Sequence, residues 1–593
     1  MWYGITIGQV RFEKVGGQLR KTDQKQGFVQ GAMTLMIGTV TVKVVSMLFK
    51  IPISNMLGGT GYSYFTNAYE IFNLISTIAT AGFPVAISKL VSENSVLGRY
   101  RDSRKIFRIS RLFFLLTGFL CMVVMILGAG TFAAMIPNPG ARLSIICLAP
   151  AVLTCCLMSA YRGYYQGMQN MYPTSISQII EAVTKMIFGL GLSGAVLYLT
   201  QREYETYGTV LGQSYAGQAQ AQAVIAQLAS GAAVLGVSLS TAAGLLYLMI
   251  RWRKKGDGVP DELVRQSPQP QRAGVLFKTI IVIAVPVCLG SLAVNFSGII
   301  DLMTVTGRLA EVMQTAPQAL LDCYGANIPE AEIINNSVHN YLYGAYSGKA
   351  VVIANLVPAL TAGLAVSALP VVAESFAQGN RLRTQRSVQM VLRITTIVCI
   401  PAGLGISALA QEVCELFFGY NSEVAIGAPL LQVLAIALTA AINSLLQAEG
   451  RVSLPVKLIL IGSLVKLAMN YILVGIPQIN IQAAPWSTLA CYLLVTVLSL
   501  IALRQSVGEL GVVSVFVKPL LAGLLCAAFA RLSQNLISTV IASRFAVLVS
   551  VAVGALVYLI ALFLLKAFKK EDIEMLPKGE KIAKTLEKYS LLG

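Results

Sequence analysis

Long apolar runs with few charges recur along this chain and restrict what it can fold into. Of its 593 residues, 56% are hydrophobic and only 12% are charged, whereas about a quarter of the residues in soluble domains are charged. A run of about 20 apolar residues is long enough to cross a bilayer as a helix. The sequence therefore predicts an all-α polytopic membrane protein and excludes a water-soluble domain.

Fourteen of these runs are long enough to span a membrane when their limits are set by charges, prolines and glycines. They fall into two sets of six followed by a final pair. The expected spans are residues 28–56, 62–88, 112–136, 142–161, 172–199, 222–250, 275–306, 349–373, 388–410, 425–446, 455–476, 484–503, 516–536 and 545–567. The expected domains are a tail (1–27), a first lobe (28–250), a linker (251–273), a second lobe (274–503) with a long outer loop (307–348), a helix pair (504–567) and a second tail (568–593).

The basic residues indicate an orientation for these spans. If both termini are cytoplasmic, 34 of the 45 lysines and arginines lie in inner segments and only four in outer loops. An excess of lysine and arginine in cytoplasmic loops is the bias that orients membrane helices. It accounts for most of the net charge of +18, so no nucleic-acid partner is expected.

An internal repeat relates the two sets of six spans. Residues 71–93 resemble residues 353–374 at a displacement of 281 or 282 positions. The same displacement relates Arg104 to Arg386, Arg111 to Arg393, Gln166 to Gln447, Pro173 to Pro455 and Lys185 to Lys466. Because six is an even number, the two lobes should share one orientation. Paired bundles around a central cleft are suited to alternating access, and two lobes in one chain favour a monomer.

Two lysines in the first span are candidates for binding an anion. A charge at a helix centre costs about 2.5–3.5 kcal/mol, so it should face a protein interior or water. Lys43 and Lys50 are seven residues apart and therefore share one helix face. Pro52 follows and is expected to bend or interrupt the helix. The alternative is that Lys50 extends to the membrane interface while Lys43 pairs with an acid such as Glu70.

Two further pairs lie at equivalent places in the repeat. In the fifth span, Glu181 and Lys185 have the i,i+4 spacing that allows them to neutralise each other. In the eleventh span, Lys466 has no acid four residues before it, and Asn470 lies one turn further on. Lys466 is therefore a stronger candidate than Lys185 for an anion-binding cation.

Asp301 is the acidic residue of the seventh span, which also contains Asn295. Asp301 is expected to pair with a cavity lysine or with Arg308, or to bind a coupling cation. Arg531, in the thirteenth span, lies outside both repeats. It is expected either to contact a lipid phosphate or to extend to the outer interface.

Motifs for catalysis or nucleotide hydrolysis are not found in the sequence. The string most similar to a phosphate-binding loop, at 344–350, has the wrong spacing, and His339 is the single histidine. Cysteine and histidine spacings indicate no metal cage. We therefore expect a protein that is not an enzyme and has no cofactor, driven by a coupling ion or by the membrane potential.

Three segments carry a family resemblance: residues 43–93, residues 159–187 (SAYRGYYQGMQNMYPTSISQIIEAVTKMI) and residues 454–475 (LPVKLILIGSLVKLAMNYILVG). They resemble the polysaccharide-transport branch of the multidrug/oligosaccharidyl-lipid/polysaccharide exporter superfamily, and within it the MurJ-like lipid II flippases and the stage V sporulation protein B group. The resemblance covers about residues 28–567.

The resemblance implies two six-helix lobes in a V, a cationic central cavity, and two C-terminal helices that form a groove for a lipid tail. By the same resemblance, the cavity residues are Lys43, Lys50, Glu181, Lys185, Lys466 and Asn470. Many relatives have arginine where this chain has lysine. Lysine retains the positive charge but cannot form the bidentate hydrogen bonds that arginine makes with phosphate.

These features together predict a flippase in the bacterial cytoplasmic membrane. It would move a polyprenyl-pyrophosphate-linked saccharide, such as lipid II or a related cell-wall precursor, with membrane lipids as its other partners. One alternative is an exporter of organic cations from the same superfamily, which predicts a cavity rich in acids and aromatics. Another is a membrane scaffold for envelope assembly that transports nothing.

Overall fold

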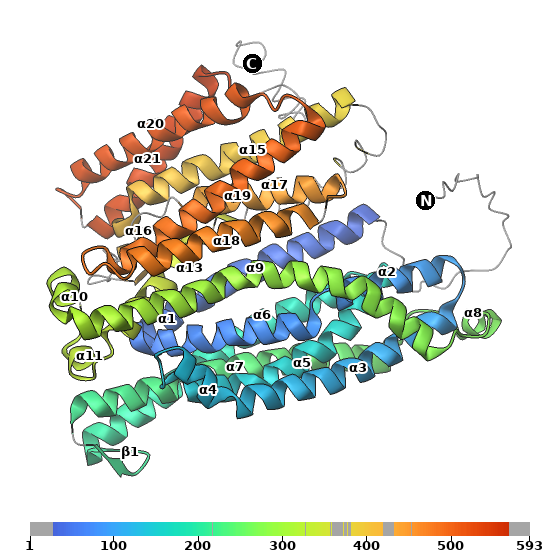
Figure 1. Cartoon of the computed structure of the whole chain (residues 1–593), viewed down its shortest axis with the longest axis horizontal. Helices are drawn as coiled ribbons and strands as arrows, with labels where there is room; N and C mark the ends of the chain where they lie inside the picture. The colour runs from blue at the N-terminus through green and yellow to red at the C-terminus, as the bar shows by residue number, and fades with distance from the viewer. Residues whose placement is uncertain are drawn as a thin grey trace.

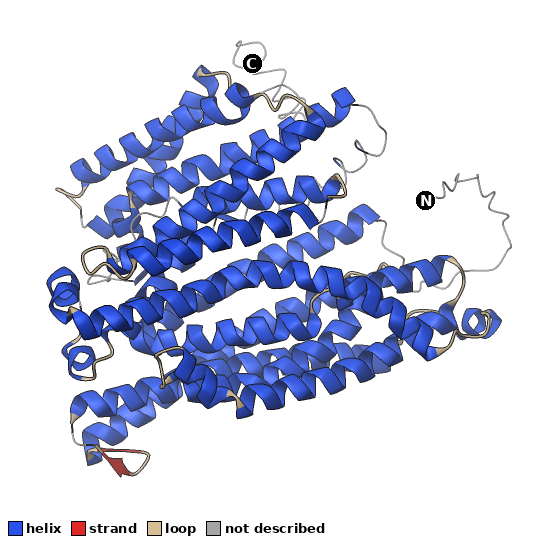
Figure 2. Ribbon diagram, in the orientation of Figure 1, coloured by secondary structure: helices blue, strands red, loops and turns tan. Residues whose placement is uncertain are grey.

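A computed structural model describes residues 28–568 except 216, 326–327, 356, 359–371, 373–375, 377–380, 419–431, 452 and 542. This part of the chain is a bundle of long helices that run side by side, with one short hairpin (Figures 1 and 2). Its first half consists of α1 (Phe28–Thr80), α2 (Phe83–Val96), α3 (Tyr100–Leu127), α4 (Ala129–Met135), α5 (Ala141–Gly167), α6 (Tyr172–Tyr207), β1 (Thr209–Val210), β2 (Gln213–Ser214), α7 (Gln218–Lys255) and α8 (Asp261–Gln266).

The second half of the chain is also helical. Its elements are α9 (Ala273–Thr315), α10 (Pro317–Tyr324), α11 (Glu330–Ile334), α12 (Val338–Ala345), the π-turn η2 (Tyr346–Ala350), α13 (Val351–Ala354), α15 (Arg381–Ala408), α16 (Ala410–Phe418), α17 (Gln432–Ala448), α18 (Ser453–Leu473), the 3₁₀-turn η4 (Asn480–Gln482), α19 (Ala483–Val507), the π-turn η5 (Val513–Val517), α20 (Lys518–Ile537) and α21 (Ser543–Leu564).

Two glycines interrupt the helices that contain the first two expected spans. The backbone of α1 leaves helical geometry at Gly58, where φ is 67°, so α1 consists of two helices joined by a kink. A second break falls at Gly82, where φ is 80°, just before α2. Side chains disfavour such positive φ angles and glycine does not. The expected interruption at Pro52 is therefore wrong, because Pro52 lies inside α1 and the kink falls further on, at Gly58.

The two halves pack their helices in the same pattern. In the first half, α3 packs on α5, α5 on α7, α7 on α6, and α6 on α1. In the second half, α15 packs on α17, α17 on α19, α19 on α18, and α18 on α9. A pair of threonine hydroxyls bonds across equivalent helix pairs: Thr154 to Thr241 at 2.6 Å and Thr439 to Thr496 at 2.7 Å. The internal repeat in the sequence is thus matched by a repeated helix arrangement.

Ten helical segments in the described part of the chain are long and apolar enough to cross a membrane, and the longest, Val44–Val96, includes both glycine breaks. Two shorter apolar helices, Ala273–Val285 and Ala435–Gln447, add to them. Most of the expected span 349–373 lies outside the described residues, as do residues 1–27 and 569–593 of the two tails. The chain is a multi-pass membrane protein, and the count of fourteen spans stays a prediction.

The two lobes contact each other near both ends of the bundle. We call the end that carries α8 and the 251–273 linker the basic end. There, Gly82 packs so closely on α9 that a Cβ added to it would lie 2.2 Å from the carbonyl oxygen of Ala284. At the opposite end, a Cβ on Gly344 of α12 would lie 1.7 Å from the carbonyl oxygen of Gly59. Between these contacts, Asn295 of α9 donates a hydrogen bond to Thr77 of α1 at 2.9 Å.

Candidate functional site

A buried ion pair joins α9 to α18. The Nζ atom of Lys466 lies 2.6 Å from Oδ2 of Asp301, and only 3% of the Lys466 side chain is exposed. Lys466 also donates to the hydroxyl of Ser297 at 3.3 Å. Charges buried in this way must be paired and hydrogen-bonded to be tolerated. Of the partners expected for Asp301, the structure shows a cavity lysine; Arg308 instead pairs with Glu311.

Asn470 completes the hydrogen bonding of Asp301. It lies one turn beyond Lys466 on the same face of α18, and its Nδ2 atom donates to Oδ1 of Asp301 at 2.9 Å and to Thr304 at 3.2 Å. Ser487 of α19 donates in turn to the side-chain oxygen of Asn470. The i,i+4 spacing identified in the sequence therefore places both side chains against one carboxylate. The small hydroxyl residues that support them carry no comparable sequence signal.

Glu70 brings a second carboxylate to this place from the other lobe. Its Oε2 atom lies so near α9 that a Cβ added to Gly298 would be 2.9 Å from it. Lys50 and Lys466 attract the Glu70 carboxylate and Asp301 repels it. The lobes thus meet where Glu70 approaches α9 beside the Lys466–Asp301 pair. We call Lys50, Glu70, Asp301 and Lys466, which act on one another electrostatically, the charge cluster. Its two positive and two negative groups have no net formal charge.

The remaining predicted lysines lie on or beside α1. Lys185 of α6 faces α1, with its Nζ atom 3.5 Å from the Ser46 hydroxyl and 5.5 Å from the centre of the Phe49 ring. Lys185 therefore lies beside the part of α1 that precedes Lys50. Lys43 is part of α1, but its side chain lies outside the described part of the structure.

The sequence left open whether Glu181 pairs with Lys185, and the structure pairs Glu181 with Arg162. Oε2 of Glu181 lies 3.0 Å from Nη2 of Arg162, a residue of α5. Nε of Arg162 also donates to the Ser177 hydroxyl at 3.0 Å. The sequence had placed Arg162 just beyond the fourth span, whereas α5 continues to Gly167 and keeps this side chain 82% buried between helices. Ser177 and Glu181 have i,i+4 spacing and so face the same partner, a signal that the sequence analysis missed.

Arg531 does not join the charge cluster. It lies on α20, a helix at the edge of the second half (Figure 1). Its Nη1 atom contacts Oε1 of Glu412 on α16 at 2.6 Å. About half of its side chain is exposed. In the described ranges, no group of three or more histidine, cysteine, aspartate and glutamate side chains is placed to hold a metal ion.

Comparisons with known proteins agree with this architecture. The family described as "Polysaccharide biosynthesis protein" matches residues 28–220, and the family described as "MatE" matches residues 345–472. The chain is 26% identical to "Lipid II flippase MurJ" of Bacillus subtilis (strain 168) over 78% of this chain and 79% of the relative. It is 21% identical to "Stage V sporulation protein B" of the same organism over 93% and 98%.

The fold is similar to a solved structure of "Lipid II flippase MurJ, inward closed conformation", with a TM-score of 0.59 and 14% identity over 90% of this chain and 98% of that chain. The chain is thus similar, in both halves, to polysaccharide-biosynthesis and MatE family proteins.

An apolar groove of about 540 Å³ lies between α15, α20 and α21. Ile397, Leu409, Cys526, Tyr558 and Leu562 are among the residues that line it.

Proposed function

We propose that this protein is a flippase that carries a polyprenyl-pyrophosphate-linked saccharide, lipid II or a related cell-wall precursor, across the bacterial cytoplasmic membrane. The observation that supports this proposal most directly is the charge cluster at the junction of the lobes. Its lysines provide charge for a pyrophosphate, and the similarity to curated relatives named as a flippase and a sporulation protein indicates the substrate class.

The proposed cycle is an exchange of partners within the charge cluster. With no substrate, Asp301 neutralises Lys466, and Glu70 lies within the field of both lysines. An entering pyrophosphate replaces these carboxylates as the partner of Lys50 and Lys466, and Lys185 and Lys43 extend the cationic surface along α1. Since the cluster includes residues of both lobes, the exchange loosens one set of contacts between them. The lobes then rock so that the head leaves on the other side.

The other parts of the proposal concern the lipid tail, the orientation in the membrane and the source of energy. The saccharide passes between the lobes while the polyprenyl tail stays in lipid along the groove of α15, α20 and α21. The basic end faces the cytoplasm together with both termini, and the chain works as a monomer with fourteen spans. Energy comes from the membrane potential acting on the anionic head, since one charge crossing the full potential gains about 2.3 kcal/mol per 100 mV.

A translocation assay on reconstituted protein tests the role of Lys466. The measured quantity is the initial rate at which fluorescent lipid II moves between leaflets. Lys466→Ala should lower this rate at least about tenfold, but it also leaves Asp301 buried without its cation, a change that destabilises folded proteins by about 3–5 kcal/mol. The double variant Lys466→Ala/Asp301→Asn removes both charges and therefore separates binding from folding.

We expect the double variant to fold with near-parental thermal stability and to remain inactive. Lys457→Ala is the matched control, because Lys457 lies on the same helix and is exposed. Full activity of the double variant would contradict the proposal. Export of an organic-cation dye instead of lipid II would favour the antiporter.

A further inference from the structure

An exposed groove runs along α3 from the basic end toward the middle of the bundle. Its first part has a volume of about 350 Å³ and is lined by Arg104, Arg108 and Arg111 together with Phe107 and Trp252. A second part of about 500 Å³ shares Arg108 and Arg111. It continues between α3, α5 and α7 and is otherwise lined mainly by apolar side chains, including Leu112, Leu115, Leu157 and Leu245. The groove is therefore cationic at one end and apolar along the rest.

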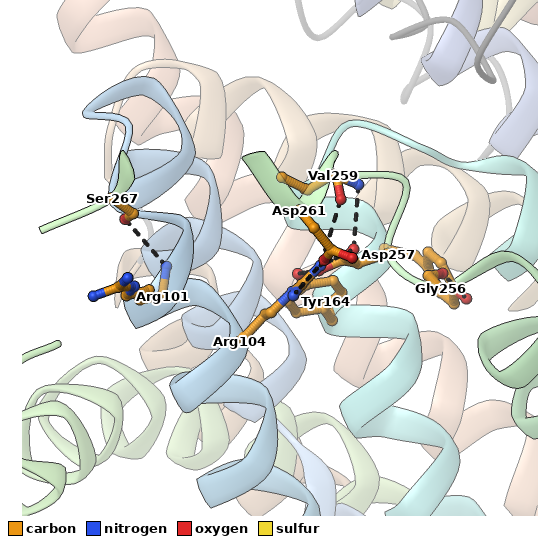
Figure 3. A network of polar contacts seen from close by, with 9 residues as sticks. Arg101, Arg104, Tyr164, Gly256, Asp257, Val259, Asp261 and Ser267 are labelled. Atoms are coloured by element: carbon orange, nitrogen blue, oxygen red, sulfur yellow. Dashed lines mark hydrogen bonds and ion pairs between the residues drawn. The ribbon is translucent and has the colours of Figure 1, made fainter. Parts of the chain in front are cut away.

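The acidic residue at the cationic end is already bound. Oδ2 of Asp257 lies 2.6 Å from Nε of Arg104, and Oδ1 lies 3.0 Å from Nη2 of the same arginine (Figure 3). Tyr164 and the backbone N–H of Val259 donate the other hydrogen bonds to this carboxylate, at 3.0 and 3.2 Å. Burial alone would raise the pKa of Asp257, but its bonds to Arg104 lower it below the ordinary value, so it stays ionised and paired.

Arg108 and Arg111 keep their charge for another partner. In the described part of the chain, the ion pairs of α3 are those of Asp102 with Arg99 and of Arg104 with Asp257 and Asp261. Both Arg108 and Arg111 are exposed and lie three residues apart, on the same side of the helix. The guanidinium of Arg111 lies 5.8 Å from the centre of the Phe107 ring, which itself packs 4.2 Å from the Trp252 ring. Aromatic packing thus fixes the floor of the cationic end.

In the second half, the face of α15 that corresponds to this face of α3 is covered by other helices. The repeat partner of Arg111 is Arg393 of α15, of which only 2% is exposed. There, Thr396 donates to the carbonyl of Val515 in η5 at 2.6 Å, and Tyr558 of α21 donates to the carbonyl of Ile397 at 2.9 Å. The C-terminal helices therefore cover the α15 face. On α3, the corresponding leucines remain exposed, for example Leu112 at 59% and Leu115 at 45%.

We propose that this groove binds an anionic glycerophospholipid, with its phosphate on Arg108 and Arg111 and an acyl chain along the leucines. In a membrane protein, such an apolar channel is filled by hydrocarbon. Its charged end lies where α3 enters the expected span at residue 112, at the depth of the lipid headgroups. Arginine pairs form strong charge-assisted hydrogen bonds with phosphate. The site is distinct from the charge cluster and does not depend on the proposed transport cycle.

Fluorescence of Trp252 provides a direct test. The full chain has three tryptophans, so Trp2→Phe and Trp486→Phe leave Trp252 as the single reporter, at the cationic end of the groove. This protein is reconstituted in vesicles of phosphatidylcholine with increasing fractions of brominated phosphatidylglycerol or brominated phosphatidylcholine. We expect phosphatidylglycerol to quench Trp252 with an apparent affinity about tenfold above that of phosphatidylcholine, since each basic residue near the surface favours anionic lipid.

Charge variants separate the site from a general surface effect. Arg108→Gln/Arg111→Gln should reduce the preference to about one, whereas Arg108→Lys/Arg111→Lys should retain most of it. Arg253→Gln/Lys254→Gln changes two exposed residues at the basic end of α7 and should leave the preference unchanged.

Equal quenching by both lipids in the parent protein, or an unchanged preference in Arg108→Gln/Arg111→Gln, would overturn the proposal. Displacement by millimolar inorganic phosphate would assign the site to a soluble anion, and displacement by 1 mol% polyprenyl pyrophosphate would assign it to substrate; either result overturns the phospholipid assignment.

Discussion

Gly298 is the residue that allows Glu70 to enter the charge cluster. Glycine inside a helix ordinarily costs about 0.5–1 kcal/mol relative to alanine, so α9 gives up some stability at this position. The missing side chain leaves space for the Glu70 carboxylate, which a Cβ would approach to 2.9 Å. A glycine that is unfavourable for the helix thus serves the contact between lobes.

Gly298→Ala should therefore lower lipid II translocation several-fold by displacing Glu70, without improving thermal stability. Gly307→Ala on the same helix is the control, because a Cβ there meets no atom within 4 Å and should stabilise the helix by about 0.5–1 kcal/mol. In a Glu70→Ala background, Gly298→Ala should have no further effect on the rate. Additive losses in the double variant would contradict this role for Gly298.

Helix α12 holds the turn between α4 and α5 through the single histidine of the chain. Nε2 of His339 lies 3.0 Å from the carbonyl oxygen of Pro137, to which Asn340 also donates, at 3.3 Å. The other ring nitrogen, Nδ1, is buried with no hydrogen-bond partner among the described atoms. A second proton on this ring would therefore be buried without an acceptor. Burial accordingly lowers the pKa of His339 below its ordinary 6.5, against the opposing effect of the Pro137 carbonyl.

This lowered pKa predicts how stability changes with pH. Below about pH 6.5 the unfolded chain takes up a proton at His339 that the folded chain does not, so stability falls as the pH falls, by up to about 1 kcal/mol at pH 5.5. Thermal unfolding in detergent between pH 7.5 and 5.5 measures the change. His339→Gln should show a smaller decrease in Tm than the parent. Burial raises the pKa of nearby Glu332, which acts with the opposite sign in both proteins and cancels in the comparison. Parallel pH profiles would contradict the prediction.

The elements were more predictable from the sequence than the partners of individual charges. Apolar runs and the displacement of 281 or 282 residues indicated the helices and the repeated bundle, because burial in lipid requires long uninterrupted segments. Glu181 shows the limit: helical spacing pointed to Lys185, but Arg162 of α5 binds it. Spacing along one helix says nothing about which neighbouring helix packs beside it. Gly298 and Ser487 carried no signal for the same reason.

At the scale of the whole molecule, the lobes are held by close backbone contacts near both ends and by the charge cluster between them. Gly82 packs against α9 near the basic end, and Gly344 packs against Gly59 near the other end. Alternating access requires one contact to open while the other holds. Since Lys50, Glu70, Asp301 and Lys466 have no net formal charge, these four residues give the empty protein little response to voltage. The anionic head of a bound substrate brings the additional charge.

The loaded step should therefore be the one that responds to the membrane potential. In proteoliposomes with a valinomycin-set potassium potential, movement of a pyrophosphate-linked substrate away from the negative side should accelerate as the potential rises from 0 to 100 mV. One charge crossing the full field gains about 2.3 kcal/mol per 100 mV, which limits the acceleration to about 50-fold per charge. Reversing the potassium gradient should slow the same movement, and protein-free vesicles should show neither effect. A rate that is independent of the sign and size of the potential would show that another source of energy drives the lobes, and a dependence on a sodium or proton gradient would identify that source.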